Sequence, residues 1–167
     1  MNTLKRLDAL KQKAFEDGKF DGFLIFNSAN LIYLTGFSGS SALLVPRNGK
    51  NTVYVYGVNY AQAEAELSDF AVELVKRGEK LTDKTAKQAS ALGIKRLAVD
   101  ALNVEGGRSL SKALGDGKTL EVDSRCLQEL RRVKDENEVE LLRKAAELTS
   151  LSFLIILISF LIQPCDL

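Results

Sequence analysis

Histidine and tryptophan are missing from the 167 residues, and the chain has only two prolines and two cysteines. Without histidine, the chain cannot form a Ser-His-Asp or Cys-His catalytic arrangement or a histidine-ligated metal site. Cys126 and Cys165 are too few to hold a metal cluster by themselves or to build the disulfide scaffold of a small secreted protein. These absences exclude most familiar hydrolase chemistry from this chain and favour a reducing, cytoplasmic environment.

A large excess of charge of either sign is also missing, because 23 Lys and Arg residues face 22 Asp and Glu residues. A nucleic-acid-binding domain would show a basic surplus, so we expect no nucleic-acid partner. Basic residues are spread through Met1 to Phe15 instead of preceding an apolar stretch, which argues against a signal peptide. With 46% hydrophobic residues, a chain of this length is expected to bury one core as a soluble domain.

Hydrophobic periodicity predicts alternating helices and strands as far as Val122. Asn48-Gly49 lies between two apolar runs, which is a strong signal for an antiparallel hairpin. The later helix–strand alternation predicts right-handed crossovers between parallel strands. We therefore expect a three-layer α/β fold: a mixed six-stranded sheet, mostly parallel with one antiparallel hairpin, flanked by helices. The predicted strands are 22–26, 42–45, 52–56, 71–75, 96–99 and 119–122, and the predicted helices are 4–15, 30–37, 60–67, 82–92, 105–114 and 126–133.

A charged stretch, Arg131 to Asn137, separates the last of these helices from a longer one. Asp135 and Glu138 form a capping-box-like start for that longer helix, whose inward face we expect to include Val139 and Leu142. The sequence therefore predicts one domain over residues 1–132, a linker and first helix over 133–150, and a tail over 151–167.

The tail is unusually apolar, since Leu151 to Ile162 contains only Ser152 and Ser159 as polar residues. As a helix this segment would reach roughly 18 Å, short of the ~30 Å hydrocarbon core of a bilayer, so we expect no membrane span. Three interpretations remain open: burial against missing protein or a partner chain, attachment to a membrane surface, or an altered end of the chain.

Short patterns that look catalytic have simpler explanations. Gly115-Asp-Gly-Lys-Thr119 imitates the end of a phosphate loop but runs from a predicted helix into a strand, which is the wrong context. Clustered carboxylates fit solvated helix faces and helix caps. A small-molecule site at the carboxyl ends of the strands, near Asn27 or Asp100, remains an alternative.

Two separate segments carry a resemblance to a known family: Asn30-Leu-Ile-Tyr-Leu-Thr-Gly-Phe-Ser-Gly-Ser-Ser41 and Leu130-Arg-Arg-Val-Lys-Asp-Glu-Asn-Glu-Val-Glu-Leu-Leu-Arg-Lys-Ala-Ala146. The first resembles the signature of the N-terminal domain of the creatinase, prolidase and Xaa-Pro aminopeptidase family. The second resembles the passage of that family into its metal-dependent pita-bread domain. The resemblance implies a creatinase N-terminal fold with a ribonuclease H-like motif.

The same resemblance implies a noncatalytic role: capping a catalytic domain, contributing to dimer contacts, and limiting substrates to short peptides with proline second. The expected partners are a second copy, in a homodimer, or a catalytic domain on which this one docks. In the family, two metal ions, often manganese, cobalt or zinc, are held by two aspartates, a histidine and two glutamates downstream of the matched segments. The resemblance therefore implies no catalytic residue, metal site or cofactor in this chain, and hydrolysis by the chain alone is not expected.

One departure bears on the subfamily. Tyr56-Gly-Val-Asn-Tyr60 stands where many aminopeptidase members carry a Thr-Asp-Gly-Arg-Tyr-like sequence. The missing acid and arginine favour resemblance to a prolidase-like Xaa-Pro dipeptidase. The alternative function is a free-standing interaction or dimerisation module without peptidase activity, which would use the apolar tail and an exposed sheet edge.

Tyr33, Phe37 and Ser38 are the candidate site residues, on a loop that faces either substrate or a dimer partner. The glycines beside them let a neighbouring molecule approach the backbone closely. The competing interpretation is that Tyr33 and Phe37, four residues apart, are packing residues of a short helix.

Overall fold

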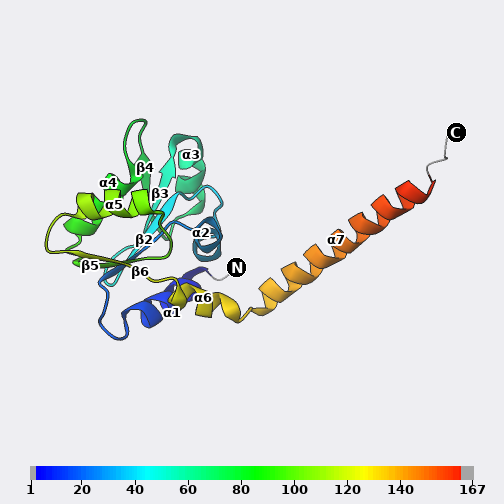
Figure 1. Ribbon diagram of the computed structural model, residues 1–167, viewed down its shortest axis with the longest axis horizontal. Coiled ribbons are helices and arrows are strands. Elements are labelled where there is room, and N and C mark those ends of the chain that lie inside the picture. The colour runs from blue at the N-terminus through cyan, green and yellow to red at the C-terminus, as the bar shows by residue number, and fades with distance from the viewer. Residues whose placement is uncertain (1–2, 163–167) are drawn as a thin grey trace. The chain divides into compact units, whose positions relative to one another are not determined.

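The computed structural model describes residues 3–162, with side chains as far as residue 159. Contacts divide the chain into two compact units, residues 1–130 and 131–167. The first unit is an α/β domain and the second is built on one long helix (Figure 1). The elements in chain order are α1 (Thr3–Phe15), β1 (Gly22–Ile25), α2 (Ser28–Thr35), β2 (Ala42–Pro46), β3 (Thr52–Tyr56), α3 (Gly57–Glu66), β4 (Ala71–Val75), α4 (Leu81–Ala91), β5 (Arg96–Val99), α5 (Val104–Leu114), β6 (Thr119–Val122), α6 (Arg125–Arg132) and α7 (Glu136–Ile162).

The described strands form one six-stranded mixed sheet, as the sequence predicts, and their order in the sheet is β4-β3-β2-β1-β5-β6. The β2–β3 pair is the predicted antiparallel hairpin, and the β3–β4, β1–β5 and β5–β6 pairs are parallel. Strand β2 also runs antiparallel to β1, with Ile25 opposite Leu43 and Gly22 opposite Pro46. The reason is that α2 and the turn after it leave the chain at the end of the sheet where β1 finishes. Strand β2 must therefore run back along β1 in the opposite direction.

Helices cover both faces of the sheet (Figure 1). Because successive strand residues point to opposite faces, the sheet supports two cores. In β1, Phe23 and Ile25 pack with residues of α1, α2, α3 and α6, whereas Leu24 packs with residues of α4 and α5. All four residues of β1 are buried, as expected for a central strand flanked on both sides.

Two helices begin earlier than the periodicity predicts by more than one residue. Helix α2 starts at Ser28 because the side chain of Asn27 caps it, accepting hydrogen bonds from the backbone N–H groups of Ala29 and Asn30. Helix α3 follows β3 directly, with Tyr56 as its N-cap residue and no side-chain cap. The cap of α2 is a local polar contact, which the spacing of apolar residues does not reveal.

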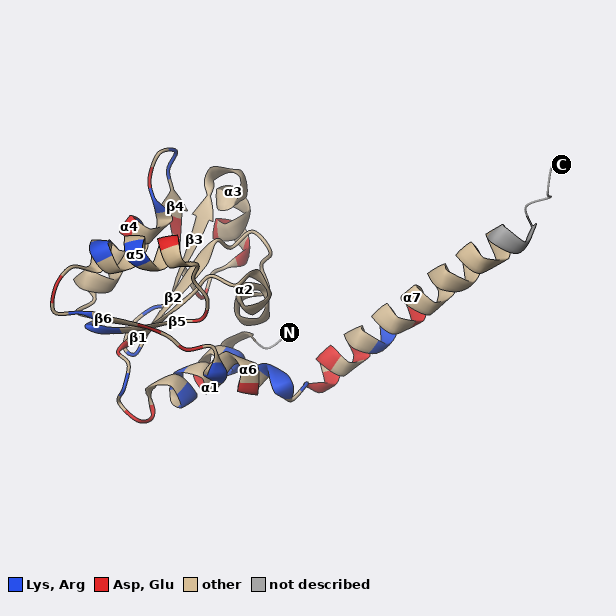
Figure 2. Cartoon of the chain, in the orientation of Figure 1, with Lys and Arg blue, Asp and Glu red and all other residues tan. Residues whose placement is uncertain are grey.

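Helix α7 differs most from expectation. Its predicted inward residues Val139 and Leu142 are exposed, and none of residues 136–159 is buried. Charged residues occupy only the first half of the helix (Figure 2). The second half is largely apolar, and its apolar side chains from Leu151 to Ile158 are exposed on all sides of the helix. Searched over the described residues, the helices include none with the length and apolar character needed to cross a bilayer. Cys165 and residues 163–167 of the predicted tail lie outside the described residues.

Asp21 joins the starts of β1 and β5 at the amino edge of the sheet. Its carboxylate accepts hydrogen bonds from the Arg96 side chain, at 2.6 Å for the Nη2–Oδ1 pair, and from the backbone N–H groups of Lys95 and Arg96. The Arg96 side-chain hydrogen bond is the main reason that the pKa of Asp21 lies below its ordinary value of 3.8, although partial burial opposes the shift. Because this pKa is lowered on folding, the ionised form of Asp21 stabilises the folded state above pH 3.8.

We therefore expect the free energy of unfolding of the wild type to fall more steeply below pH 3.8 than that of Asp21→Asn. Below that pH the unfolded chain takes up a proton before the folded one does, and the stabilisation disappears as the pH falls through the lowered pKa. Urea unfolding at several values between about pH 2.5 and 6 measures this slope. Equal slopes for the two proteins would contradict the assignment, and Asp116→Asn, in the exposed turn before β6, is the matched control.

Candidate functional site

The carboxyl ends of β1 and β5 meet at a buried carboxylate. Asp100 follows β5 and is 4% exposed. Its Oδ1 accepts a hydrogen bond from the backbone N–H of Phe26 at 2.8 Å, and its Oδ2 accepts bonds from the backbone N–H of Asn27 at 3.2 Å and from Nδ2 of Asn30 at 2.8 Å. The carboxylate thus ties the end of β5 to the residues that start α2.

This arrangement bears on the small-molecule hypothesis. The fold does bring Asn27 and Asp100 together, since each follows one of two neighbouring parallel strands. However, Asp100 accepts its bonds from the protein itself, and the Asn27 side chain is used to cap α2. The buried carboxylate of Asp100 accepts hydrogen bonds from three donors of the protein, so its role here is to position α2.

The turn after α2 has a defined, tightly held shape. Gly36 ends the helix with φ 74°, a left-handed conformation that favours glycine. The hydroxyl of Thr35 donates to the carbonyl of Leu31 and accepts from the backbone N–H of Phe37. Gly39 has no room for a side chain, because an added Cβ would lie 2.7 Å from ring carbons of Phe37 and 2.8 Å from Cγ of Asn59. Asn59 also donates to the carbonyl of Gly39 at 3.2 Å.

The three candidate site residues take different positions. Phe37 is 4% exposed and belongs to the core shared by α1, α2, α3 and α6. Tyr33 is half-buried and packs against the same core. Ser38 is exposed at the tip of the turn. The structure therefore brings Tyr33 and Phe37 to the core side of the segment and leaves Ser38 at its surface.

Two residues that the sequence reasoning passed over support this segment. Arg6 of α1 is 7% exposed, and its guanidinium lies 4.1 Å from the centre of the Tyr33 ring. Its spacing is a usable signal, because Arg6 lies one helical turn before Leu10 on the apolar face of α1. Asn59 carries no such signal, since its contact with Gly39 joins residues 20 positions apart.

A shallow polar groove of about 580 Å³ lies between α4 and α5. The hydroxyls of Thr82 and Ser109 bond at 3.1 Å and link the two helices. The groove is lined by three lysines, including Lys112, and by a single carboxylate, Asp83. Over the described residues, no group of three or more His, Cys, Asp or Glu side chains is arranged to hold a metal ion. The donors present therefore do not fit the two-metal site that the family resemblance places downstream.

Comparisons with known proteins agree with this fold. The family model "Creatinase/Prolidase N-terminal domain" matches residues 6–133. "Uncharacterized peptidase YqhT" of Bacillus subtilis (strain 168) is 31% identical over 136 residues, covering 80% of this chain and 37% of the relative. An Xaa-Pro dipeptidase from Bacillus anthracis has a similar structure, with a TM-score of 0.81, 25% identity, and coverage of 95% of this chain and 44% of that one.

One solved structure, which is an N-terminal domain by itself, is matched over almost its whole length. The N-terminal domain of the cytoplasmic peptidase PepQ from Mycobacterium tuberculosis H37Rv is 30% identical with a TM-score of 0.65, covering 75% of this chain and 98% of that one. By contrast, the chain spans less than half the length of the Bacillus subtilis and Bacillus anthracis relatives. The family model covers most of the chain, and the chain therefore belongs to the Creatinase/Prolidase N-terminal domain family.

Proposed function

We propose that residues 1–132 are the noncatalytic N-terminal domain of an Xaa-Pro peptidase, which caps a catalytic domain, contributes to dimer contacts and limits the length of substrates. The observation that carries this proposal is the family match over residues 6–133. The similarity to an Xaa-Pro dipeptidase structure over 95% of the chain supports it and favours a dipeptidase as the parent. Residues 133–150 then form the linker and the first helix of the following domain.

The signature segment suits a contact surface better than a catalytic one. The hydroxyl of Thr35 accepts a hydrogen bond from the backbone N–H of Phe37, the side chain of Asn59 donates to the carbonyl of Gly39, and the Phe37 ring packs in the core. A turn held in this way presents Ser38 and the neighbouring small residues at little cost in conformational entropy when another molecule packs against it. Ser38 is therefore the proposed contact residue of this segment, while Tyr33 and Phe37 support it.

Metal chemistry is assigned to a catalytic domain and not to this one. Two divalent ions such as manganese, cobalt or zinc would be held there, and the described residues of this chain offer no matching donor group. We propose that this chain supplies no metal ligand and does not hydrolyse Xaa-Pro peptides by itself. A cytoplasmic location is part of the proposal, supported by the description of the PepQ relative as a cytoplasmic peptidase.

A second candidate function rests on a specific observation about α7. Its apolar residues from Leu151 to Ile158 are exposed on every side, whereas a helix that is apolar all round is normally buried. A free-standing module that dimerises through this segment would cover that surface. The tail beyond residue 150 is the part of the chain on which the two candidate functions differ.

Cleavage of an Xaa-Pro dipeptide by the purified full chain in the presence of manganese is the test of the first proposal. We expect no turnover above buffer, because the chain has no histidine and no group of metal donors among its described residues. Robust manganese-dependent turnover that is lost on chelation would overturn it. A full-length dipeptidase assayed on the same substrate is the positive control.

Light scattering after size exclusion, with and without residues 151–167, separates the two functions. A dimer that becomes a monomer when these residues are removed supports the assembly module. An oligomeric state that is unchanged by the deletion counts against it and leaves the first proposal standing.

A further inference from the structure

We propose that Tyr33 is a positioning residue that holds the last turn of α6, and so fixes the point at which the chain leaves the first unit. Tyr33 belongs to the segment that resembles the family signature, and the sequence alone makes it a candidate for contact with substrate or a dimer partner. Its ring and hydroxyl instead contact two other helices of the domain, so that Tyr33 links α2 to α1 and α6.

The ring of Tyr33 is held from the side of α1. The guanidinium of Arg6 stacks at 4.1 Å from the ring centre, and its Nη1 donates to the backbone carbonyl of Tyr33 at 3.1 Å. Arg6 is 7% exposed, so this cation–π contact is largely shielded from water. Such contacts are strongest when they are removed from water. One buried side chain therefore fixes both the ring and the backbone of Tyr33.

The hydroxyl of Tyr33 reaches the other way, to α6. It donates to the backbone carbonyl of Leu130 at 3.5 Å. The last four carbonyls of a helix have no partner within that helix, and in α6, which ends at Arg132, Leu130 carries one of them. Tyr33 thus supplies a side-chain cap to the end of α6, across 97 positions of sequence.

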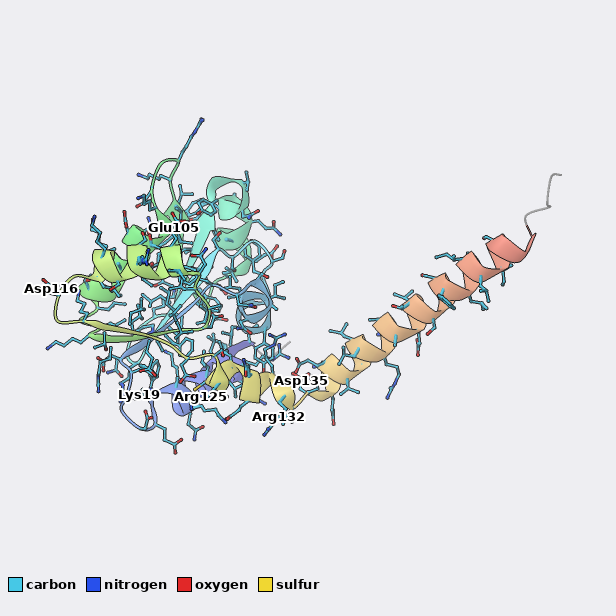
Figure 3. The ribbon with its side chains drawn as sticks, in the orientation of Figure 1. Lys19, Glu105, Asp116, Arg125, Arg132 and Asp135 are labelled. Carbon is cyan, nitrogen blue, oxygen red and sulfur yellow. The ribbon has the colours of Figure 1, made fainter. Side chains whose placement is uncertain are left out.

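Apolar packing and an ion pair also anchor α6 to the same domain. Leu127 is buried in the core that includes α1 and α2, and Leu130 packs against that core. Lys13 of α1 forms an ion pair with Glu129 of α6. The first unit ends at residue 130, one helical turn beyond Leu127. The Tyr33 hydroxyl therefore attaches the last turn of α6 to the domain, close to the charged stretch in which Figure 3 labels Arg132 and Asp135.

Tyr33→Phe removes the hydroxyl and keeps the ring, so the stack with Arg6 and the core packing remain. The end of α6 would then open more often, exposing the bonds after Arg131 and Arg132 to trypsin. We expect cleavage of the full chain at these bonds to be about fivefold faster in the variant, in proportion to the loss of one hydrogen bond. Cleavage in the exposed β4–α4 loop, after Lys76 and Arg77, should keep its wild-type rate.

Tyr60→Phe is the matched control, because it removes a hydroxyl that bonds Glu64 on the exposed face of α3. It should leave cleavage after Arg131 and Arg132 unchanged. A second variant, Arg6→Lys, keeps the charge but loses the planar stack and should accelerate the same bonds. If Tyr33→Phe leaves these bonds unchanged, or accelerates the β4–α4 loop equally through a general loss of stability, the proposal is wrong.

Discussion

Replacing Asp100 by alanine is expected to lower the free energy of unfolding by at least about 3 kcal/mol, because three donors lose their acceptor together. Two of these donors are the backbone N–H groups of Phe26 and Asn27, which lie between β1 and α2 and have no other acceptor among the contacts described above. The third is the side-chain amide of Asn30, whose bond to Asp100 is buried. Urea unfolding followed by circular dichroism measures the change.

Two variants sharpen this experiment. Asp116→Ala is the same chemical change in the exposed turn between α5 and β6 (Figure 3), and it should alter the stability by no more than about 0.5 kcal/mol. Asp100→Asn keeps one acceptor oxygen but turns an amide donor toward a group that also donates. Its loss in the free energy of unfolding should therefore lie between those of Asp116→Ala and Asp100→Ala. A loss for Asp100→Ala as small as that of Asp116→Ala would remove Asp100 from its structural role.

The sheet could be predicted because its signals are local. Short apolar runs bounded by glycine or polar residues mark the six strands, and Asn48-Gly49 marks the hairpin between β2 and β3. The antiparallel β1–β2 pair could not be seen in this way. It follows from the path of the chain through α2, and that path depends on the contact of Asn30 with Asp100, 70 residues away.

The candidate site could be predicted only in part from the sequence, for the same reason. The spacing of Tyr33 and Phe37 leaves two interpretations, and apolar periodicity cannot choose between a core face and a binding face. The choice comes from contacts with distant parts of the chain, such as Arg6 on α1 and Leu130 on α6. Helix α7 illustrates the opposite limit: its apolar pattern predicts an inward face, but the described residues supply nothing to cover it.

Phe37→Ala gives the other large effect and separates a packing role from a contact role in the signature segment. Phe37 is 4% exposed, and removing its ring would leave a cavity beneath the turn that Gly39 closes. Truncation of a buried phenylalanine costs about 3–5 kcal/mol, which is a large share of the stability of a domain of this size. We expect a loss in that range for the first unit, measured by urea unfolding as above.

Ser38→Ala changes the neighbouring residue on the exposed tip of the turn and should alter the stability by no more than about 0.5 kcal/mol. Phe153→Ala makes the same change as Phe37→Ala at an exposed position of α7 and should be equally mild. If Phe37→Ala proved as mild as these two, the ring would be free to serve an outside molecule. A large loss at Phe37 alone would instead mean that the signature phenylalanine supports the turn from within, leaving Ser38 as the residue of the pair available to a partner.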